Sequence, residues 1–191
     1  MDFSAGSLCS NKTIVKLVVI YGQEATGKLT IAKSLAAATS LKLFHNHVSI
    51  DVANTLFKYG EQDCDDLVLC VRLLVMEAAA KSDIAGLIFT WAYTHPECFA
   101  QLQAILETVA PYNSVVHFVH VHCSQYELEM RQQSWNRTLA GKIDSVAGLH
   151  KQQKRKNCIE IPNSNSLVLK NSRFPPEAAG RLIIEEFGLN T

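Results

Sequence analysis

Residues 14–30, IVKLVVIYGQEATGKLT, contain the pattern that decides the fold. An apolar, β-branched run ends at Gly22 and a helix-forming stretch follows Lys28, which predicts a strand, a loop and a helix. Gly22, Gly27 and Lys28 stand at the spacing GxxxxGK. In this context the loop amides and the helix N-terminus cradle phosphate, and the lysine reaches the β- and γ-phosphates of a nucleoside triphosphate. The alternative is a glycine-rich turn with an incidental lysine.

The predicted phosphate loop is also the predicted cofactor site, and it comprises Gly22, Gln23, Glu24, Ala25, Thr26, Gly27, Lys28, Leu29 and Thr30. Leu29 replaces the hydroxyl residue that usually follows the lysine, and Thr30 comes one place later. Thr30 is therefore the candidate ligand for phosphate or Mg²⁺, and the alternative is a helix residue that bonds back to the preceding turn. Glu24 places a negative charge close to the bound phosphates, which disfavours fast catalysis.

Length and composition predict one domain with an ordinary core. The chain has 191 residues, and its 18 basic and 18 acidic residues cancel, so neither a nucleic acid nor a membrane is the expected partner. The six cysteines lack metal-finger spacing and indicate reduced thiols in an intracellular protein. Residues 1–13 do not resemble a signal peptide, so we expect a flexible leader and a cytoplasmic protein. The oligomeric state is left open.

Short apolar runs alternate with helical patterns along the chain, which predicts a parallel sheet with helices on both faces. The predicted strands are 15–21, 41–45, 86–91, 115–121 and 166–169. Two helices are predicted at about 50–58 and 65–81. Two more are predicted to begin at the capping boxes Thr94–Glu97 and Ser124–Glu127, and a last one runs from Pro175 to Gly188.

The string GKLT resembles the GKxT form of adenylate-kinase-type loops. The strings LKLFHNHVSID at 41–51, GLIFTWAY at 86–93 and RxxxxxRxxxGKI at 131–143 resemble small bacterial P-loop proteins described as shikimate-kinase-like. From about Lys16 to Leu189 the chain thus resembles the nucleoside-monophosphate and shikimate kinase group.

This resemblance implies a three-layer α/β P-loop NTPase fold with a five-stranded parallel sheet in the order 2-3-1-4-5. It implies a single domain over 14–191, a lid segment at about 131–158, and ATP at the carboxyl ends of the strands. It also implies phosphoryl transfer to a small-molecule acceptor.

Carried over by position, Arg131 and Arg137 match the lid arginines that embrace the transferring phosphoryl group, and 171–175 match the segment that lines the adenine. The planar guanidinium suits this catalytic role, and the alternative is a pair of solvated arginines on a surface helix. Two motifs depart from shikimate kinases. Residues 45–47 replace an acidic pair, and residues 91–93 replace a glycine triplet.

Three candidate residues follow the second predicted strand. Strand alternation places His45 and His47 on one face, where they could orient the acceptor or bind a metal; the alternative is a pair of histidines satisfied by neighbouring carbonyl groups. Asp51 is the candidate general base or Mg²⁺ partner. Its alternative is a helix-dipole role, because Ser49 resembles an N-cap.

Arg72 interrupts an otherwise apolar helical stretch. The corresponding helix of the resembling kinases carries an acceptor-binding arginine, which is the first interpretation. The second is a structural ion pair with Glu77 or Asp66. His120 and His122 share a face of the fourth strand, and we expect them to be core or edge residues.

The predicted function is therefore ATP-dependent phosphoryl transfer to a small molecule, with Lys28, Arg131, Arg137 and Asp51 as the catalytic group. The rival is a nucleotide-binding regulatory protein or a slow NTPase without transfer activity. The rival is favoured by Glu24 and by the lack of a carboxylate at the end of the third strand, near Thr90. A nucleic-acid-processing ATPase is disfavoured by the zero net charge.

Overall fold

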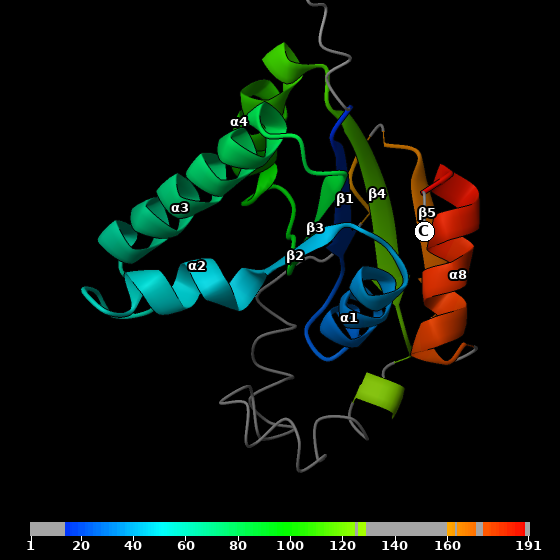
Figure 1. The fold of residues 1–191 in the computed structure, drawn as a ribbon. Helices are drawn as coiled ribbons and strands as arrows, with labels where there is room; N and C mark the ends of the chain where they lie inside the picture. The colour runs from blue at the N-terminus through cyan, green and yellow to red at the C-terminus, as the bar shows by residue number, and fades with distance from the viewer. Residues whose placement is uncertain (1–13, 125, 129–159, 163, 171–173, 190–191) are drawn as a thin grey trace, which may run out of the picture.

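Five parallel strands form the centre of the protein (Figure 1). The computed structural model describes residues 14–124, 126–128, 160–162, 164–170 and 174–189. The sheet has the order β2-β3-β1-β4-β5, and every neighbouring pair is parallel, which confirms the prediction. Each strand agrees with its predicted range to within one residue; the strands are β1 (Lys16–Tyr21), β2 (Lys42–His45), β3 (Gly86–Trp91), β4 (Val115–His122) and β5 (Ser166–Lys170).

Helices cover both faces of this sheet, so the predicted three-layer α/β fold is confirmed. Figure 1 shows α1 (Lys28–Ala38) and α8 (Pro176–Phe187) on one face and α3 (Gln62–Lys81) and α4 (Phe99–Val109) on the other. The remaining helical elements are α2 (Asn46–Ala53), which packs against α3, and the short 3₁₀ helix η1 (Ala110–Tyr112). None of the helices in the described parts of the chain is long and apolar enough to span a membrane.

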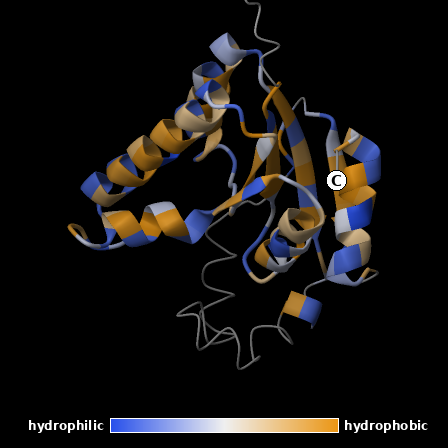
Figure 2. Ribbon diagram, viewed as in Figure 1, coloured by the Kyte–Doolittle hydropathy of each residue, from blue (hydrophilic) through white to orange (hydrophobic). Residues whose placement is uncertain are grey.

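The central strand β1 is buried on both of its faces, and apolar residues run along the strands in Figure 2. Val18 and Ile20 pack with α1 and α8, whereas Leu17, Val19 and Tyr21 pack with α3 and α4. A one-residue slip of the strand would exchange these two sets between two differently shaped cores. The register of the sheet is therefore strongly specified.

The helix predicted at about 50–58 lies earlier in the chain: α2 runs from Asn46 to Ala53, so both its start and its end were wrong. The helix begins at Asn46, directly after β2, and its N-cap is His45, so Ser49 lies inside the helix and is buried. The Asn46 amide donates to Thr90 Oγ1 (3.2 Å), a contact between residues that lie far apart in sequence. Tertiary contacts thus fix a helix start that local capping rules placed later.

The two predicted capping boxes had different outcomes. At Ser124 the box is confirmed, because the Ser124 amide donates to Glu127 Oε2 (2.9 Å). At Thr94 it is wrong: α4 begins at Phe99, and Cys98 is its N-cap without a side-chain cap. The last helix runs from Pro176 to Phe187, and Gly188 ends it, as predicted, as a C-cap in the left-handed conformation.

Gly86 lets β3 approach β1 at the amino edge of the sheet. A Cβ atom at Gly86 would lie 2.2 Å from the Lys16 carbonyl oxygen and 2.7 Å from Leu41 Cδ2. The first neighbour is backbone and cannot move without displacing β1.

We therefore expect Gly86→Ala to lower the free energy of unfolding by about 3 kcal/mol, because the added methyl group overpacks the sheet. Urea unfolding measures this loss. The matched control is Gly180→Ala in α8, where the new Cβ would be no closer than 3.4 Å to Ser34 Oγ. The control should be neutral or up to about 1 kcal/mol more stable, because alanine favours a helix. Equal effects of the two variants would contradict this account of the β1–β3 contact.

Two histidines of β4 are partly buried. His117 stacks on Phe187 with ring centroids 4.3 Å apart, and His120 stacks on Tyr21 at 4.8 Å. Burial lowers the pKa of His117, and the charge of Lys16 lowers it further. Burial also lowers the pKa of His120, against a smaller opposite effect of Glu160.

Both pKa values are lower in the folded protein than in the unfolded chain, so the unfolded chain binds more protons as the pH falls below about 6.5. The free energy of unfolding should therefore fall as the pH drops through this range. Urea titrations from pH 7.5 to 5.5 measure the slope, and the double variant His117→Gln/His120→Gln should flatten it. An unchanged slope in the double variant would rule out these two residues as its source.

Candidate active site

Glycines fix both ends of the phosphate loop, which connects β1 to α1. Gly22 has φ 145°, and a Cβ atom there would lie 2.2 Å from the Val121 carbonyl oxygen of β4. Its amide donates to the Trp91 carbonyl of β3 (3.3 Å). Gly27 has φ 88° and is the N-cap of α1. The GxxxxGK spacing thus places the loop at the carboxyl edge of the sheet, between β3 and β4.

Ala25, at the centre of the loop, also has a positive φ of 68°. This conformation is strained for a residue with a Cβ atom, and it persists only where the surroundings hold it. Here Ala25 packs against Cys123 and Leu128, which follow β4. Left-handed residues set between ordinary ones are the backbone from which anion-binding turns are built.

Lys28 folds back over the loop that precedes it. Its Nζ donates to the carbonyl oxygens of Gly22 (2.8 Å) and Gln23 (2.5 Å), and Thr26 Oγ1 donates to the same Gln23 carbonyl (2.9 Å). The first turn of α1 has no side-chain cap, and a helix N-terminus carries a partial positive charge. A lysine ammonium and a helix N-terminus therefore face the same loop, and these groups fit a bound polyphosphate.

The other loop residues are placed as follows. Thr30 lies in the first turn of α1 and is exposed, whereas Glu24 and Leu29 are partly buried. Among the described residues, no three His, Cys, Asp or Glu side chains gather closely enough to hold a metal ion. The Mg²⁺ role of Thr30 stays a prediction.

Arg72 of α3 is buried at the same edge of the sheet, with 5% of its surface exposed. Its guanidinium donates to three neutral side chains, and its Cζ lies 5.7 Å from the ring centroid of Phe89 and 5.8 Å from that of Trp91. The three acceptors are Asn46 Oδ1 (2.6 Å) and Ser49 Oγ (3.3 Å) of α2, and Gln101 Oε1 (3.2 Å) of α4. One side chain thus joins three helices beneath the ends of β2 and β3.

The alternative interpretation of Arg72, a structural ion pair with Glu77 or Asp66, is wrong. Glu77 pairs with Lys81 (2.8 Å), and Asp66 accepts a hydrogen bond from Gln62 (2.8 Å). Burial lowers the pKa of Arg72 to about 10, so the group stays charged at neutral pH. A buried cation held by neutral partners is costly to the fold, and an anion supplied from outside would offset that cost.

His45 is the N-cap of α2, and His47 and Asp51 lie within this helix. The prediction that the two histidines share a strand face is wrong, because β2 ends at His45 and His47 is helical. Their ring centroids nevertheless lie 6.3 Å apart. Asp51 is exposed on the same helix, two residues after the buried Ser49. The acceptor roles of all three stay predictions.

The sequence analysis missed several polar residues of this region. Asn46 and Ser49 belong to a string that the sequence analysis quotes, but their role as acceptors for Arg72, like that of Gln101, is recognisable only from the contacts in the structure. Tyr93 and His95, in the loop between β3 and α4, form a hydrogen bond between the Tyr93 hydroxyl and His95 Nδ1 (3.0 Å). The isolated arginine in an apolar helix was the one available signal that buried polar partners exist.

Several predicted residues lie outside the described ones and cannot be placed. They are the lid arginines Arg131 and Arg137, the rest of the lid segment 131–158, the leader 1–13, and residues 171–173 of the predicted adenine-lining segment.

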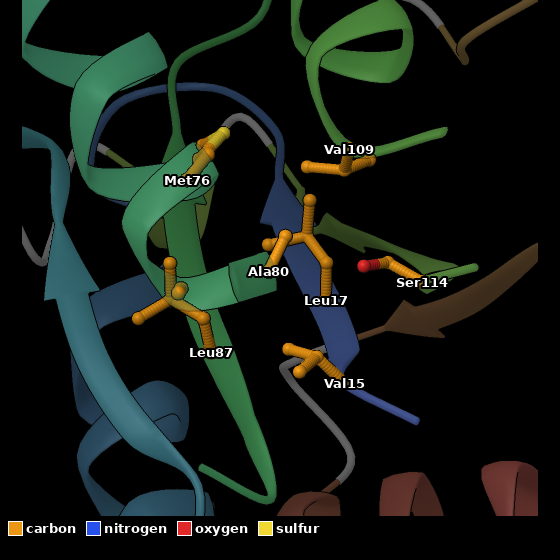
Figure 3. Close-up of a pocket in the computed structure, with 8 residues that line it drawn as sticks. Val15, Leu17, Met76, Ala80, Leu87, Val109 and Ser114 are labelled. Atoms are coloured by element: carbon orange, nitrogen blue, oxygen red, sulfur yellow. The ribbon is translucent and has the colours of Figure 1, made fainter. Parts of the chain in front are cut away.

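A small cavity lies under α3 and α4 near the amino ends of β1 and β3, away from the phosphate loop (Figure 3). Its volume of about 10 Å³ is enough for one water molecule at most. The buried Ser114 Oγ on its wall has no hydrogen-bond partner among the described residues. This cavity is too small to be a substrate site.

No protein-family model matches the chain, and no curated protein sequence is similar to it. Solved structures do match it over nearly their whole length. A sugar kinase from Janibacter sp. HTCC2649 is 19% identical with a TM-score of 0.66, over 92% of this chain and 95% of that one.

An APS kinase from Mycobacterium tuberculosis, solved with AMPPNP and APS, is 12% identical with a TM-score of 0.63, over 92% and 99%. A shikimate kinase from Acinetobacter baumannii is 12% identical with a TM-score of 0.56, over 92% and 94%. The chain therefore has the fold of the P-loop kinases of the shikimate-kinase-like group.

Proposed function

We propose that this protein is an ATP-dependent kinase that phosphorylates a small-molecule acceptor carrying an anionic group. The observation that carries the proposal is the meeting of the phosphate loop and the buried Arg72 at one residue, Trp91. The Trp91 carbonyl accepts the amide of Gly22, and the Trp91 ring lies under the guanidinium.

This arrangement suits phosphoryl transfer, which depends on positioned positive charge and an aligned acceptor more than on covalent chemistry. Lys28 and the helix N-terminus would hold the triphosphate. Arg72 would anchor the anionic group of the acceptor on the α3–α4 side of the same edge. The kinases with the same fold, among them a sugar kinase and an APS kinase, support transfer to a small molecule.

The remaining roles are assigned on the same basis. Thr30 would bind phosphate or Mg²⁺, and Arg131 and Arg137 would close over the transferring phosphoryl group. His45, His47 and Asp51 would line the acceptor side, with Asp51 as general base. Bound Mg²⁺ would supply charge neutralisation at the triphosphate.

The first experiment is Mg·ATP turnover against a pooled panel of nucleotides, hydroxy acids, sugar acids and neutral sugars, with products detected by mass. A phosphorylated anionic acceptor would support the proposal. Transfer only to neutral acceptors would overturn the role of Arg72. ATP binding without any product would favour a nucleotide-binding regulator, in line with the lack of an acidic residue in β3.

Lys28→Ala should raise the dissociation constant of ATP by about 100-fold or more, because a charge-assisted contact to phosphate contributes about 3 kcal/mol. Titration calorimetry with ATP measures the change. The matched control is Lys33→Ala, an exposed lysine on the same helix, which should bind ATP like the wild type. If both variants keep their ATP affinity, the phosphate loop does not bind nucleotide.

Arg72→Met should raise the KM of the anionic acceptor by about 30-fold or more while leaving the KM of ATP unchanged, since a charge-assisted hydrogen bond contributes about 2 kcal/mol. Because the change leaves the three acceptor side chains without their buried donor, it should also lower the free energy of unfolding, by about 2–4 kcal/mol. Steady-state kinetics and urea unfolding measure the two effects, with the exposed Arg181→Met as the charge control. An unchanged acceptor KM would show that Arg72 only joins the helices.

A further inference from the structure

Tyr21 is the last residue of β1 and directly precedes the phosphate loop. Its side chain is completely buried and lies across the neighbouring strand β4. The ring stacks on His120 with centroids 4.8 Å apart and planes 4° from parallel. It meets Phe118 edge-on at 6.5 Å and Tyr93 edge-on at 5.9 Å. The ring position is therefore fixed by aromatic contacts on several sides.

The Tyr21 hydroxyl reaches the chain that leads into β5. It lies 2.8 Å from Ser166 Oγ and accepts a hydrogen bond from the Ile161 amide (3.1 Å). Ser164 Oγ lies 2.7 Å from Ser166 Oγ and donates to the Ile161 carbonyl (2.9 Å). These contacts form a closed ring of hydrogen bonds, and the Ile161 side chain is buried in the same core cluster as Tyr21.

The protonation state of the Tyr21 hydroxyl decides whether it can donate as well as accept a hydrogen bond. Burial raises the pKa of Tyr21, so the phenol stays protonated at neutral pH. The hydroxyl can therefore donate to Ser166 while it accepts from Ile161. Phenylalanine at position 21 could keep the aromatic contacts with His120, Phe118 and Tyr93. It would leave the buried Ile161 amide without its hydrogen-bond partner, and such amides are rarely left unpaired.

The segment held by these hydrogen bonds begins at a charged residue, Glu160. Glu160 directly precedes Ile161 and acts electrostatically on both Tyr21 and His120, and Lys28 acts on His120 as well. Residues 160–162 are thus held beside the strand end that leads into the phosphate loop.

We propose that Tyr21, through its hydroxyl, couples the phosphate loop to residues 160–162 and 164–166. This inference rests on the nucleotide binding proposed above. Binding of a triphosphate at Gly22–Lys28 would fix the end of β1, and the Tyr21 hydroxyl would pass that ordering to Ile161, 140 residues away in sequence. The tie is specific to a tyrosine at this position, because only the hydroxyl reaches Ile161 and Ser166.

Amide hydrogen exchange with and without saturating Mg·ATP tests the coupling and needs no acceptor. In the wild type, nucleotide should slow exchange both in residues 22–28 and at the Ile161 amide, the latter by about tenfold. In Tyr21→Phe the slowing in 22–28 should persist, whereas that at Ile161 should fall below about twofold. If the hydroxyl were merely structural, its removal in Tyr21→Phe would speed Ile161 exchange equally with and without nucleotide.

Two further variants sharpen the test. Tyr112→Phe removes a tyrosine hydroxyl that donates to Glu77 Oε1 (3.1 Å) on the outer side of α3, and it should behave like the wild type. Ser166→Ala removes another member of the ring, and the double variant Tyr21→Phe/Ser166→Ala should lose no more coupling than Tyr21→Phe alone, because the groups act as one unit. Urea unfolding of each variant confirms that the compared proteins are folded.

The outcomes separate the two proposals. Slowing at 22–28 without slowing at Ile161 in the wild type, or equal slowing at Ile161 in Tyr21→Phe, would overturn the role of Tyr21 and leave nucleotide binding intact. No slowing at 22–28 in the wild type would overturn nucleotide binding, and the role of Tyr21 with it.

Discussion

The close approach of the Gly22 backbone to the Val121 carbonyl is the constraint on which the site depends. No Cβ atom fits between them, since it would lie 2.2 Å from the carbonyl oxygen. On its other side Gly22 is held by the Trp91 carbonyl. The loop therefore leaves the sheet at one fixed point between β3 and β4, and the direction of α1 follows from that point. Lys28 and the helix N-terminus can face the same space only because this exit is fixed.

The fold was predictable where the signal is local. The five strands are short apolar runs bounded by polar residues, and the GxxxxGK spacing marks a strand-to-helix turn. The structure agrees with both features and with the strand order that the family resemblance implied. Burial of β1 and β3 on both faces makes these two strands readable without knowledge of their neighbours.

The site was less predictable because its parts meet only in three dimensions. The start of α2 depends on Thr90 and Arg72, which lie 44 and 26 residues from Asn46. Nothing in the string around Ser49 shows that its hydroxyl faces a guanidinium. Likewise, Tyr21 looks like the last apolar residue of a strand, and its hydroxyl acquires partners only when the chain returns 140 residues later. Spacing rules describe neighbours along the chain and do not predict such contacts.

The three-way attachment of Arg72 has a consequence for how proteins of this design can change over evolutionary time. Replacing the arginine would leave Asn46, Ser49 and Gln101 facing an empty space between α2, α3 and α4, so a viable replacement requires several concerted substitutions. Residues such as His47 and Asp51 stand outside this network of three contacts and can vary one at a time. Under the role proposed for Arg72, substitutions at these outer positions would change which acceptors fit, while the cation proposed to hold their anionic group would stay the same.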